Sequence, residues 1–548
     1  GGSWVWAYDA NGFLQSLTDP FGKATQFTIN GSGELLSRID RNNRRIDFEY
    51  DAAHHITQEK WYTTPQRVAS YSYNVVGQLT SAVDPDGAIT IDYFNTGQVK
   101  SVDNAGTPGA PRVLIGYSYD ADGNVIRVED SLGGSTDYIY DGLDRLSRVT
   151  QSGTGVNEKR VDMFYDSASL LIELRRFSNL AGTQGVSNTL FDYDCGGCSG
   201  RLKSIHHRKA SNNAVIHDMD FTRDQLGNVL STTDAEGTHA YTYDALRQLK
   251  TAMHSQTAVQ PNELYTYDAV GNRLTSHLSD SYSYSYQNGG KGNRLLQDSQ
   301  YTYQYDDNGN LIRLTSRING RSLDFIYDYR NRVSALIEHD SAGIEQRRSE
   351  YNYDVLDRRI SVRENNSTFY FVYDGLNPML KLLATGNVVT RRMYSPMVDL
   401  LFADQFSGIT RWTLTDQVGT PRNLVSNDGA SLNHYVYDSF GQLLQQTNSS
   451  IQSDFLFSGR EFNSNSVGYF RARYYIPGLG RFLQEDQLEP KRYMYCSNNP
   501  LAFTDPLGLS DLPESSFLSN LIYGVRLAIQ QRNFPLLMLF NILDDKRQ

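Results

Sequence analysis

Cysteine is scarce in this chain of 548 residues, with three in all. Cys195 and Cys198 flank two glycines and Cys496 stands alone, so the cysteines cannot build a disulfide scaffold. A zinc site at Cys195 and Cys198 would need a second pair of ligands at suitable spacing, and the sequence shows none. We interpret this pair as part of a small turn, and we expect the fold to depend on its own buried strands.

Long apolar runs and an excess of basic residues are also missing. No run of about 18 apolar residues exists, so no single helix of this sequence is expected to span a membrane. The formal charge is -11, from 51 basic and 62 acidic residues. That balance favours a solvated surface and lacks the basic stripe that nucleic-acid binding needs. The sequence therefore predicts no nucleic-acid partner, and it predicts neither a cofactor nor a metal site.

Tyrosine and glycine are abundant instead, with 37 and 44 residues, while proline is low at 15. This composition suits many short strands joined by tight turns and does not suit helical bundles. A pattern recurs: aromatic-x-Tyr-Asp, two or three residues, Gly, Asn or Gln, then Leu or Val. Equivalent tyrosines lie 20 to 24 residues apart, which holds two strands and two turns. Clear copies lie at 117–125, 265–274, 303–311 and 435–443, with leucine-containing variants at 140–146 and 353–358.

Each repeat unit has a local physical explanation. In the segment 241–244, the period of two places the rings of Tyr241 and Tyr243 on one face of a strand and Thr242 on the other. Asp244 can then accept hydrogen bonds from backbone N–H groups two residues on, and a glycine at the turn supplies a positive φ. A second turn follows in many copies, as at 84–87 and 234–237.

A single hairpin cannot bury its aromatic face alone, so the units must pair edge to edge along the chain. The sequence thus predicts an all-β fold built on a long antiparallel sheet. Because strands twist, a sheet of this many strands has to curl. The periodicity alone leaves open whether it closes into a hollow shell or remains a rod.

Both ends of the chain and one internal segment depart from the pattern. The chain begins inside a repeat, at residues 8–12, so we expect a fragment of a longer array. Residues 388–430 are interpreted as a decorated repeat with a longer turn. From residue 510 the repeat stops, and apolar residues between Phe517 and Ile529 recur at helical spacing before Pro535. We predict two short helices or one broken helix, which could pack as a plug, travel as cargo or act as a membrane-active peptide.

Taken together, the Tyr-Asp units resemble the YD repeats of the Rhs family. The stretch from residue 457 to residue 509 resembles the Rhs repeat-associated core, and residues 412–422 resemble the segment upstream of it. The resemblance covers nearly all of residues 1–509 and extends to the C subunits of insecticidal toxin complexes and to teneurins. It implies YD-repeat hairpins coiled into a large hollow β-shell, which is closed by the core as a plug and followed by a short helical tail.

The same resemblance implies three parts with different roles. Residues 1–450 would form the shell, residues 451–509 the core with an intramolecular aspartic protease, and residues 510–548 a variable segment retained as cargo or plug. Such a protein would cut itself once, and its partners would be its own enclosed C-terminal segment and a secretion or delivery system. The resemblance places it outside the cell or at the cell surface, in toxin delivery or interbacterial competition.

Carried over by position, the bond to be cut is Leu509–Ser510. Asp486 and Asp505 are the implied catalytic pair, and Arg481 is the implied organising cation. Two carboxylates held together cannot both ionise easily, so one can act as acid while the other activates water. Holding the target peptide in the same chain supplies positioning without a binding step. The sequence departs from the family at Ile476 and Gln487, and neither change removes a carboxylate.

Three alternatives stay open. Asp486 and Asp505 could be side-chain caps of turns, as the repeat aspartates are. The Ser510 hydroxyl could instead attack the Leu509 carbonyl in an N-to-O acyl shift. The whole chain could be a non-catalytic surface or structural protein whose tyrosine-rich strands bind glycans or partner proteins.

Overall fold

The protein is an all-β shell in the computed structural model, which describes residues 3–194, 200–286, 292–396, 398–463, 466–486 and 493–513. Two large antiparallel sheets, of 23 and 16 strands in those ranges, account for most of the described chain. The described residues form no α-helix, only short 3-10 turns. Within the same ranges there is no helix with the length and apolar character that a membrane crossing requires.

The first sheet is a meander in which each strand pairs with the next along the chain. Its strands are β1 (Val5–Tyr8), β2 (Leu14–Thr18), β3 (Ala24–Ile29), β4 (Leu35–Ile39), β5 (Arg45–Tyr50), β6 (Ile56–Trp61), β7 (Arg67–Tyr73), β8 (Leu79–Val83), β9 (Ala88–Tyr93), β10 (Val99–Asp103), β11 (Leu114–Tyr119), β12 (Val125–Asp130), β13 (Gly134–Tyr140), β14 (Leu146–Gly153), β15 (Lys159–Tyr165), β16 (Leu171–Phe177), β17 (Gly185–Asp194), β18 (Arg201–Lys209), β19 (Val215–Arg223), β20 (Val229–Asp234), β21 (Gly237–Tyr243), β22 (Leu249–His254) and β23 (Glu263–Leu264).

The second sheet continues the meander after a small pair of strands. That pair is β24 (Thr266–Tyr267) and β25 (Arg273–Thr275). The strands of the second sheet are β26 (Ser283–Tyr284), β27 (Leu295–Gln297), β28 (Tyr301–Tyr305), β29 (Leu311–Ser316), β30 (Ser322–Tyr327), β31 (Val333–His339), β32 (Glu345–Tyr353), β33 (Arg359–Glu364), β34 (Ser367–Asp374), β35 (Asn377–Leu383), β36 (Val388–Tyr394), β37 (Leu401–Phe406), β38 (Ile409–Thr415), β39 (Pro421–Val425), β40 (Ser431–Tyr437) and β41 (Leu443–Gln446).

The hairpin of β21 and β22 shows why the repeat folds as it does. Tyr241 is buried and Thr242 is exposed, which confirms the predicted alternation. The Asp244 carboxylate accepts hydrogen bonds from the N–H groups of residues 246 and 248, each at 2.9 Å. The register shifts beside Tyr243, so the turn carries a β-bulge. Its left-handed position is taken by Arg247, with φ of 66°, where most other repeats have glycine.

In most repeats the tyrosine just before the turn joins its hairpin to the preceding one. The tyrosine hydroxyl donates a hydrogen bond to the backbone carbonyl of the first strand residue after the previous turn. Tyr437 is an exception, since its buried hydroxyl has no hydrogen-bond partner among the described residues. Tyr140 reaches the carbonyl of Val125 at 3.0 Å, and Tyr353 reaches that of Val333 at 2.7 Å. The same bond is made by Tyr50, Tyr73, Tyr93, Tyr119, Tyr165, Tyr193, Tyr243, Tyr267, Tyr327 and Tyr373. Phenylalanine could pack in these places but could not satisfy the carbonyl.

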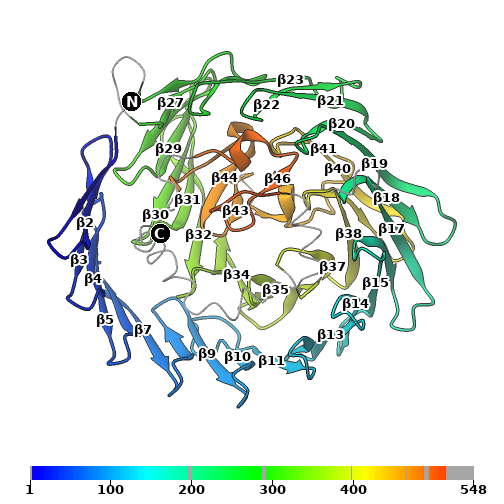
Figure 1. Ribbon diagram of the computed structural model, residues 1–548, viewed down its shortest axis with the longest axis horizontal. Helices are drawn as coiled ribbons and strands as arrows, with labels where there is room; N and C mark the ends of the chain where they lie inside the picture. The colour runs from blue at the N-terminus through cyan, green and yellow to red at the C-terminus, as the bar shows by residue number, and fades with distance from the viewer. Residues whose placement is uncertain are drawn as a thin grey trace.

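The meander curls into a ring, and the chain then follows a second turn of the same path (Figure 1). Contacts between the two turns join residues far apart in the sequence: Arg330 pairs with Glu59, Arg391 with Asp130, and Arg422 with Glu236. The largest buried apolar cluster likewise combines side chains of β10–β22 with side chains of β34–β39. The sheet therefore closes into a shell because its second turn packs against its first.

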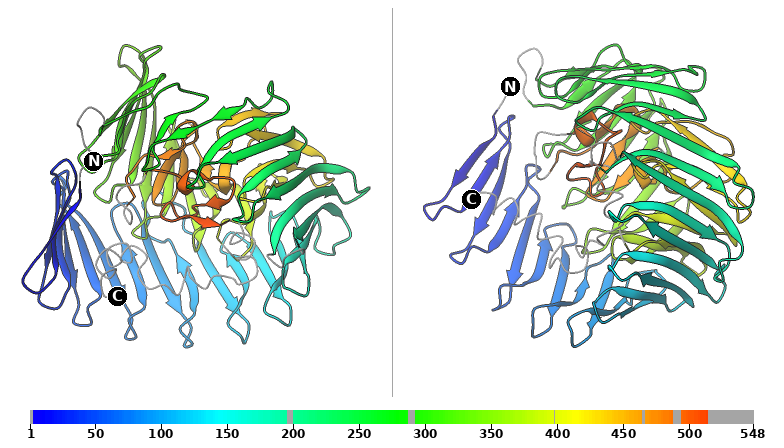
Figure 2. Two further views of the ribbon diagram at one scale, coloured as in Figure 1. Left: turned by 45° about the horizontal axis from the view of Figure 1, so that its top comes forward. Right: turned by 45° about the vertical axis from the view of Figure 1, so that its right-hand side comes forward.

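The described residues between 451 and 513 lie inside this shell (Figures 1 and 2). They form a four-stranded sheet of β42 (Glu461–Phe462), β43 (Gly468–Phe470), β44 (Arg473–Ile476) and β45 (Arg481–Phe482), and the pair β46 (Phe503–Thr504) and β47 (Leu512–Pro513). The 3-10 turns η2 (Phe457–Gly459), η3 (Pro477–Leu479) and η4 (Cys496–Asn498) connect them. We call residues 451–513 the core segment.

The core segment is fixed to the shell through the turns of the repeats. The Asn498 side chain donates to the carbonyl of Gly271 and the Tyr493 hydroxyl to that of Gly309, each at 2.8 Å. Arg359 of β33 forms an ion pair of 2.7 Å with Glu461. Asn499 donates to the Asn228 side chain, in the turn between β19 and β20, at 2.9 Å, so turns from separate parts of the shell hold the core segment.

Two features differ from the sequence-based expectations, and others lie outside the described residues. The turn between β38 and β39 is not longer than that between β21 and β22, since each has five residues. Asp416 accepts from the N–H groups of residues 418 and 420, as Asp244 does from 246 and 248. Residues 512 and 513 form a strand, β47. The predicted helices beyond residue 513 and the Cys195–Cys198 turn lie outside the described residues.

Candidate functional site

The Leu509–Ser510 peptide lies in a loop that joins the paired strands β46 and β47. Asp505 starts this loop, and its side chain is almost completely buried. Its Oδ1 atom accepts hydrogen bonds from the N–H groups of Leu509 at 2.8 Å and Ser510 at 3.1 Å. One carboxylate oxygen is therefore in contact with the nitrogen of the peptide bond that the sequence identified.

Three arginines hold the backbone carbonyls of the loop. Arg460 donates to the Pro506 carbonyl at 3.0 Å, and Arg471 donates to the same oxygen. Arg473 donates through Nε to the Gly508 carbonyl at 2.5 Å. These cations compensate carbonyls that the buried position would otherwise leave without water. The loop is thus fixed in one conformation beside the buried carboxylate.

Gly508 is required by this arrangement. Its φ of 71° is left-handed, and a Cβ atom there would lie 2.4 Å from the Phe470 carbonyl oxygen. Any other residue would both strain the backbone and push the loop away from β43. The close approach of the loop to the core sheet therefore depends on glycine.

Arg473 joins the two predicted catalytic carboxylates. Its Nη2 atom lies 2.9 Å from Asp486 and 3.2 Å from Asp505. The guanidinium stacks over the Phe482 ring, with 3.8 Å to the ring centroid. All three charged side chains are buried. The structure therefore brings Asp486 and Asp505 to one cation, next to the Leu509–Ser510 bond.

Arg481 is not that cation. It donates to the Tyr284 hydroxyl at 3.1 Å and to the Asn293 carbonyl at 3.0 Å, and it lies between the rings of Tyr284 and Tyr493. It therefore fixes the core segment to the shell wall, and the place expected for Arg481 belongs to Arg473. The sequence could have pointed to Arg473, because Arg471 and Arg473 directly precede the aromatic pair Tyr474-Tyr475. Arginines beside apolar residues that become buried need carboxylate partners.

Burial raises the pKa of the Asp505 carboxyl above its usual value, while the Arg473 guanidinium and the N–H groups of Leu509 and Ser510 oppose the rise. The Cys496 thiol is also buried, and burial together with the charges of Asp511 and Asp505 raises its pKa well above the usual value. The thiol is therefore neutral, and the acid–base chemistry of this site falls to the carboxyl groups.

The hydrogen bonds of Asp505 differ from those of a repeat turn. A repeat aspartate accepts from the residues two and four positions on, as Asp244 does. Asp505 accepts from the residues four and five positions on. Asp505 does cap its own loop, as expected if it were a turn cap. The second hydrogen bond of this cap comes from the nitrogen of the Leu509–Ser510 peptide bond.

Comparisons with known proteins agree with the architecture. A family model described as teneurin YD-shell matches residues 199–503, and one described as RHS repeat matches residues 119–156. Double-stranded DNA deaminase toxin A of Burkholderia cenocepacia is 23% identical over 93% of this chain and 42% of its own length. Teneurin-4 of Mus musculus is 23% identical over 91% of this chain and 19% of its own. Salivary gland surface protein 1 of Aedes aegypti is 23% identical over 72% and 12%.

Solved structures share the fold at low sequence identity. The crystal structure of TcdB2-TccC3-Cdc42 superposes with a TM-score of 0.76 and 18% identity, over 92% of this chain and 28% of that chain. The structure of TcdB2-TccC3 superposes with a TM-score of 0.75 over 92% and 29%. The chain thus spans less than half the length of the relatives that it matches, and the structural likeness shows the fold.

Proposed function

The chain belongs to the teneurin YD-shell family, and from that membership we propose that it is an encapsulating shell that cuts itself once, between Leu509 and Ser510. The segment after the cut is retained by the shell until it is delivered. The similarity to a bacterial deaminase toxin supports a role in toxin delivery, with the protein outside the producing cell or at its surface. In this proposal residues 1–450 are the container and residues 451–509 close it and carry the chemistry.

One observation carries the proposal. The Asp505 carboxylate contacts the Ser510 nitrogen at 3.1 Å while it shares the Arg473 guanidinium with Asp486. A general acid must lie within hydrogen-bond reach of the leaving group, and Asp505 does. A buried carboxyl with a raised pKa keeps its proton at a pH where an ordinary aspartate has lost it.

The proposed reaction is hydrolysis of one peptide bond. Asp486, which pairs with Arg473, takes a proton from a water molecule whose oxygen adds to the Leu509 carbonyl carbon. The carbon–nitrogen bond then breaks, and Asp505 gives its proton to the Ser510 nitrogen. The products are a Leu509 carboxylate and a Ser510 amine. Arg473 keeps the two carboxyl groups together and fixes the Gly508 carbonyl beside the bond.

Intact mass spectrometry after expression tests the cleavage. Wild type should yield a species ending at Leu509 and a second one beginning at Ser510. Asp505→Asn and Asp486→Asn should each slow the cut by about 10²- to 10⁴-fold, the usual contribution of a general acid or base. Asp340→Asn is the matched control, because Asp340 caps an exposed repeat turn in the ordinary way.

The same measurement separates the two chemical routes. Ser510→Ala should leave the aspartate route intact, whereas it would block an N-to-O acyl shift. If Asp486→Asn and Asp505→Asn process like wild type, the protease part of the proposal is wrong. Retention is tested separately: after cleavage, residues 510–548 should co-elute with the shell in native size-exclusion chromatography and separate from it in denaturant.

A second candidate function is a non-catalytic surface protein. It is favoured by the similarity to teneurin-4 and to a salivary gland surface protein. In that case the repeats bind glycans or partner proteins, and Asp505 only caps its loop. An unbroken chain of 548 residues in wild type and in both aspartate variants would support this candidate over the first.

A further inference from the structure

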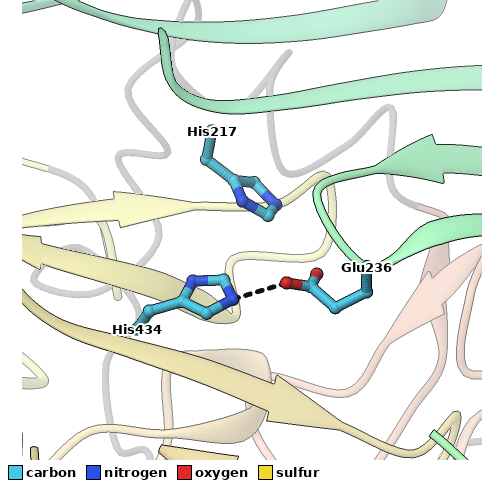
Figure 3. Close-up of side chains that lie close together, drawn as sticks. All are labelled: His217, Glu236 and His434. Atoms are coloured by element: carbon cyan, nitrogen blue, oxygen red, sulfur yellow. Dashed lines mark hydrogen bonds and ion pairs between the residues drawn. The ribbon is translucent and has the colours of Figure 1, made fainter. Parts of the chain in front are cut away.

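Three side chains with metal-binding chemistry meet where the second turn of the shell passes the first. His217 comes from β19, Glu236 from the tight turn between β20 and β21, and His434 from β40 of the second sheet. One ligand atom of each lies within 4.8 Å of the other two, and Figure 3 shows the two rings and the carboxylate facing one another. The histidines are 217 residues apart in the sequence, so no short motif could have revealed this cluster.

His217 is the unusual member of the cluster. It is 1% exposed, and neither ring nitrogen has a hydrogen-bond partner in the part of the chain that the structure describes. A buried polar group without a partner is costly, and its presence in a folded protein needs an explanation. A metal ion bound by one of these nitrogens would supply the missing partner, since an unprotonated imidazole nitrogen is a common metal ligand.

The other two side chains are already oriented by neighbours. His434 Nδ1 lies 3.2 Å from the Asn423 side-chain oxygen, and its Nε2 is directed at Glu236, 2.7 Å away. The second oxygen of Glu236 accepts from Arg422 at 3.0 Å. Such contacts are typical around metal ligands. They hold the histidine nitrogen and the carboxylate oxygen that do not bind the metal, and so orient the atoms that do.

The cluster lines a cavity of about 370 Å³ between the two sheets. Ala235, Ala430 and Ser431 also line it and are exposed, so the cavity has a route from solvent. Two histidines and one glutamate that face such a space leave a fourth position for water or another ligand, as in zinc sites with three protein ligands.

We propose that His217, Glu236 and His434 bind a zinc ion that joins the first turn of the shell to the second. Imidazole and carboxylate suit Zn²⁺, and tetrahedral bonds of the usual length hold ligand atoms about 3.3 Å apart. In the structure the three atoms lie within 4.8 Å of one another, so binding requires side-chain rotations that bring them to that spacing. Glu236 and Asp234 offset the charges of the metal and of Arg422, which pairs with both carboxylates. Removing the metal leaves His217 unsatisfied and loosens the contact between the turns.

Zinc titration by calorimetry tests the proposal with the whole chain after chelation. It is done in a Cys195→Ser, Cys198→Ser background, so that these thiols do not contribute. We expect one equivalent of Zn²⁺ to bind and the melting temperature to rise with the metal concentration. Co²⁺ in place of Zn²⁺ should give the absorption of a tetrahedral complex.

Single substitutions identify the ligands. His217→Gln, Glu236→Gln and His434→Gln should each weaken the binding at least about tenfold and abolish the metal-dependent rise in melting temperature. Glu236→Gln and His434→Gln change less buried side chains, so they still report if His217→Gln fails to fold. His207→Gln is the buried control, because His207 also bridges the two sheets, through the Thr415 carbonyl, but lies outside the cluster. His54→Gln is the exposed control.

The outcomes are decisive in both directions. Loss of binding in the ligand variants with binding kept in His207→Gln and His54→Gln supports the site. Absence of binding in the background protein, or equal binding in Glu236→Gln and His434→Gln, overturns it.

Discussion

Arg473 shows how a single residue can define the candidate site. Two buried carboxylates of like charge would repel each other. The Arg473 guanidinium pairs with both Asp486 and Asp505 and so offsets this repulsion. A lysine could not at once hold both carboxylates and donate to the Gly508 carbonyl with a separate fixed nitrogen. The side chain is therefore a positioning residue for the proposed reaction.

We predict that Arg473→Lys slows self-cleavage by about tenfold or more, because the planar geometry that orients both carboxylates is lost. Arg481→Lys should leave the rate near that of wild type, since Arg481 contacts the shell wall and neither carboxylate. The appearance of the fragment beginning at Ser510 is followed over time by mass spectrometry. Equal rates in the two variants would contradict the assignment of Arg473.

Lys159 is a buried charge whose cost depends on pH. It is fully buried on β15, and burial together with Arg391 lowers its pKa to about 7. The unfolded chain, with an ordinary lysine pKa, binds more protons than the folded chain between pH 7 and about 10. Stability should therefore rise with pH across that window, and the full cost of the charge should be present below pH 7.

We predict that Lys159→Met stabilises the protein at pH 7 by about 1–4 kcal/mol and removes the rise in stability between pH 7 and 10. Thermal unfolding at several pH values measures both effects. Lys100→Met is the matched control on an exposed strand position and should change neither. A rise with pH that survives in Lys159→Met would show that other groups cause it.

At the scale of the hairpin, the repeated tyrosine connects neighbours. Tyr140 donates to the Val125 carbonyl, beside the bulge of the preceding hairpin, and the same kind of bond occurs in both turns of the shell. Burial of the phenol raises the pKa of Tyr50, Tyr73 and Tyr119 to about 12, so the hydroxyl remains a donor at any physiological pH. The abundance of tyrosine over phenylalanine, 37 against 24, follows from this bond.

We predict that Tyr140→Phe lowers the free energy of unfolding by about 1 kcal/mol, because the Val125 carbonyl loses its donor. Replacing Tyr50, Tyr93, Tyr140 and Tyr243 together should cost about four times as much, since these tyrosines lie in hairpins that are not adjacent and distant sites add. Denaturant unfolding measures both. Tyr301→Phe is the control, because its hydroxyl makes no hydrogen bond among the described residues, and it should change little.

At the scale of the whole molecule, stability depends on contacts between the two turns. Arg391 of β36 pairs with Asp130 at the end of β12, and both side chains are nearly inaccessible to water. Removing one member of a buried ion pair leaves the other charge uncompensated, which costs about 3–5 kcal/mol. The free energy of unfolding of variants of this pair therefore measures how much the contact between the two turns stabilises the shell.

We therefore predict that Arg391→Met strongly destabilises the shell and that Asp130→Asn added to it recovers most of the loss. The neutral amide oxygen can still accept the turn hydrogen bond that Asp130 accepts from Leu132. Arg112→Met, which breaks an exposed pair with Asp103, should stay within about 0.5 kcal/mol. Unfolding free energies of the four proteins provide the test, and similar losses in Arg391→Met and Arg112→Met would refute it.

The sequence by itself determined the hairpin and its turns. Alternation at Tyr241–Tyr243 and the cap at Asp244 depend only on neighbours within five residues, and the structure confirms both. It also required a sheet that curls, and it identified Asp486, Asp505 and the Leu509–Ser510 bond through the resemblance of the core. Whether that bond is cut stays a prediction.

Only the tertiary structure decided which distant residues meet. The twist of each strand pair is small and variable, and its sum over a whole turn fixes which strand of the second sheet passes which strand of the first. No local sequence pattern determines this accumulated twist, so the sequence could not predict that His217 and His434 lie close together. For the same reason Arg473, and not Arg481, stands between the two carboxylates: the packing of the core inside the closed shell sets their directions.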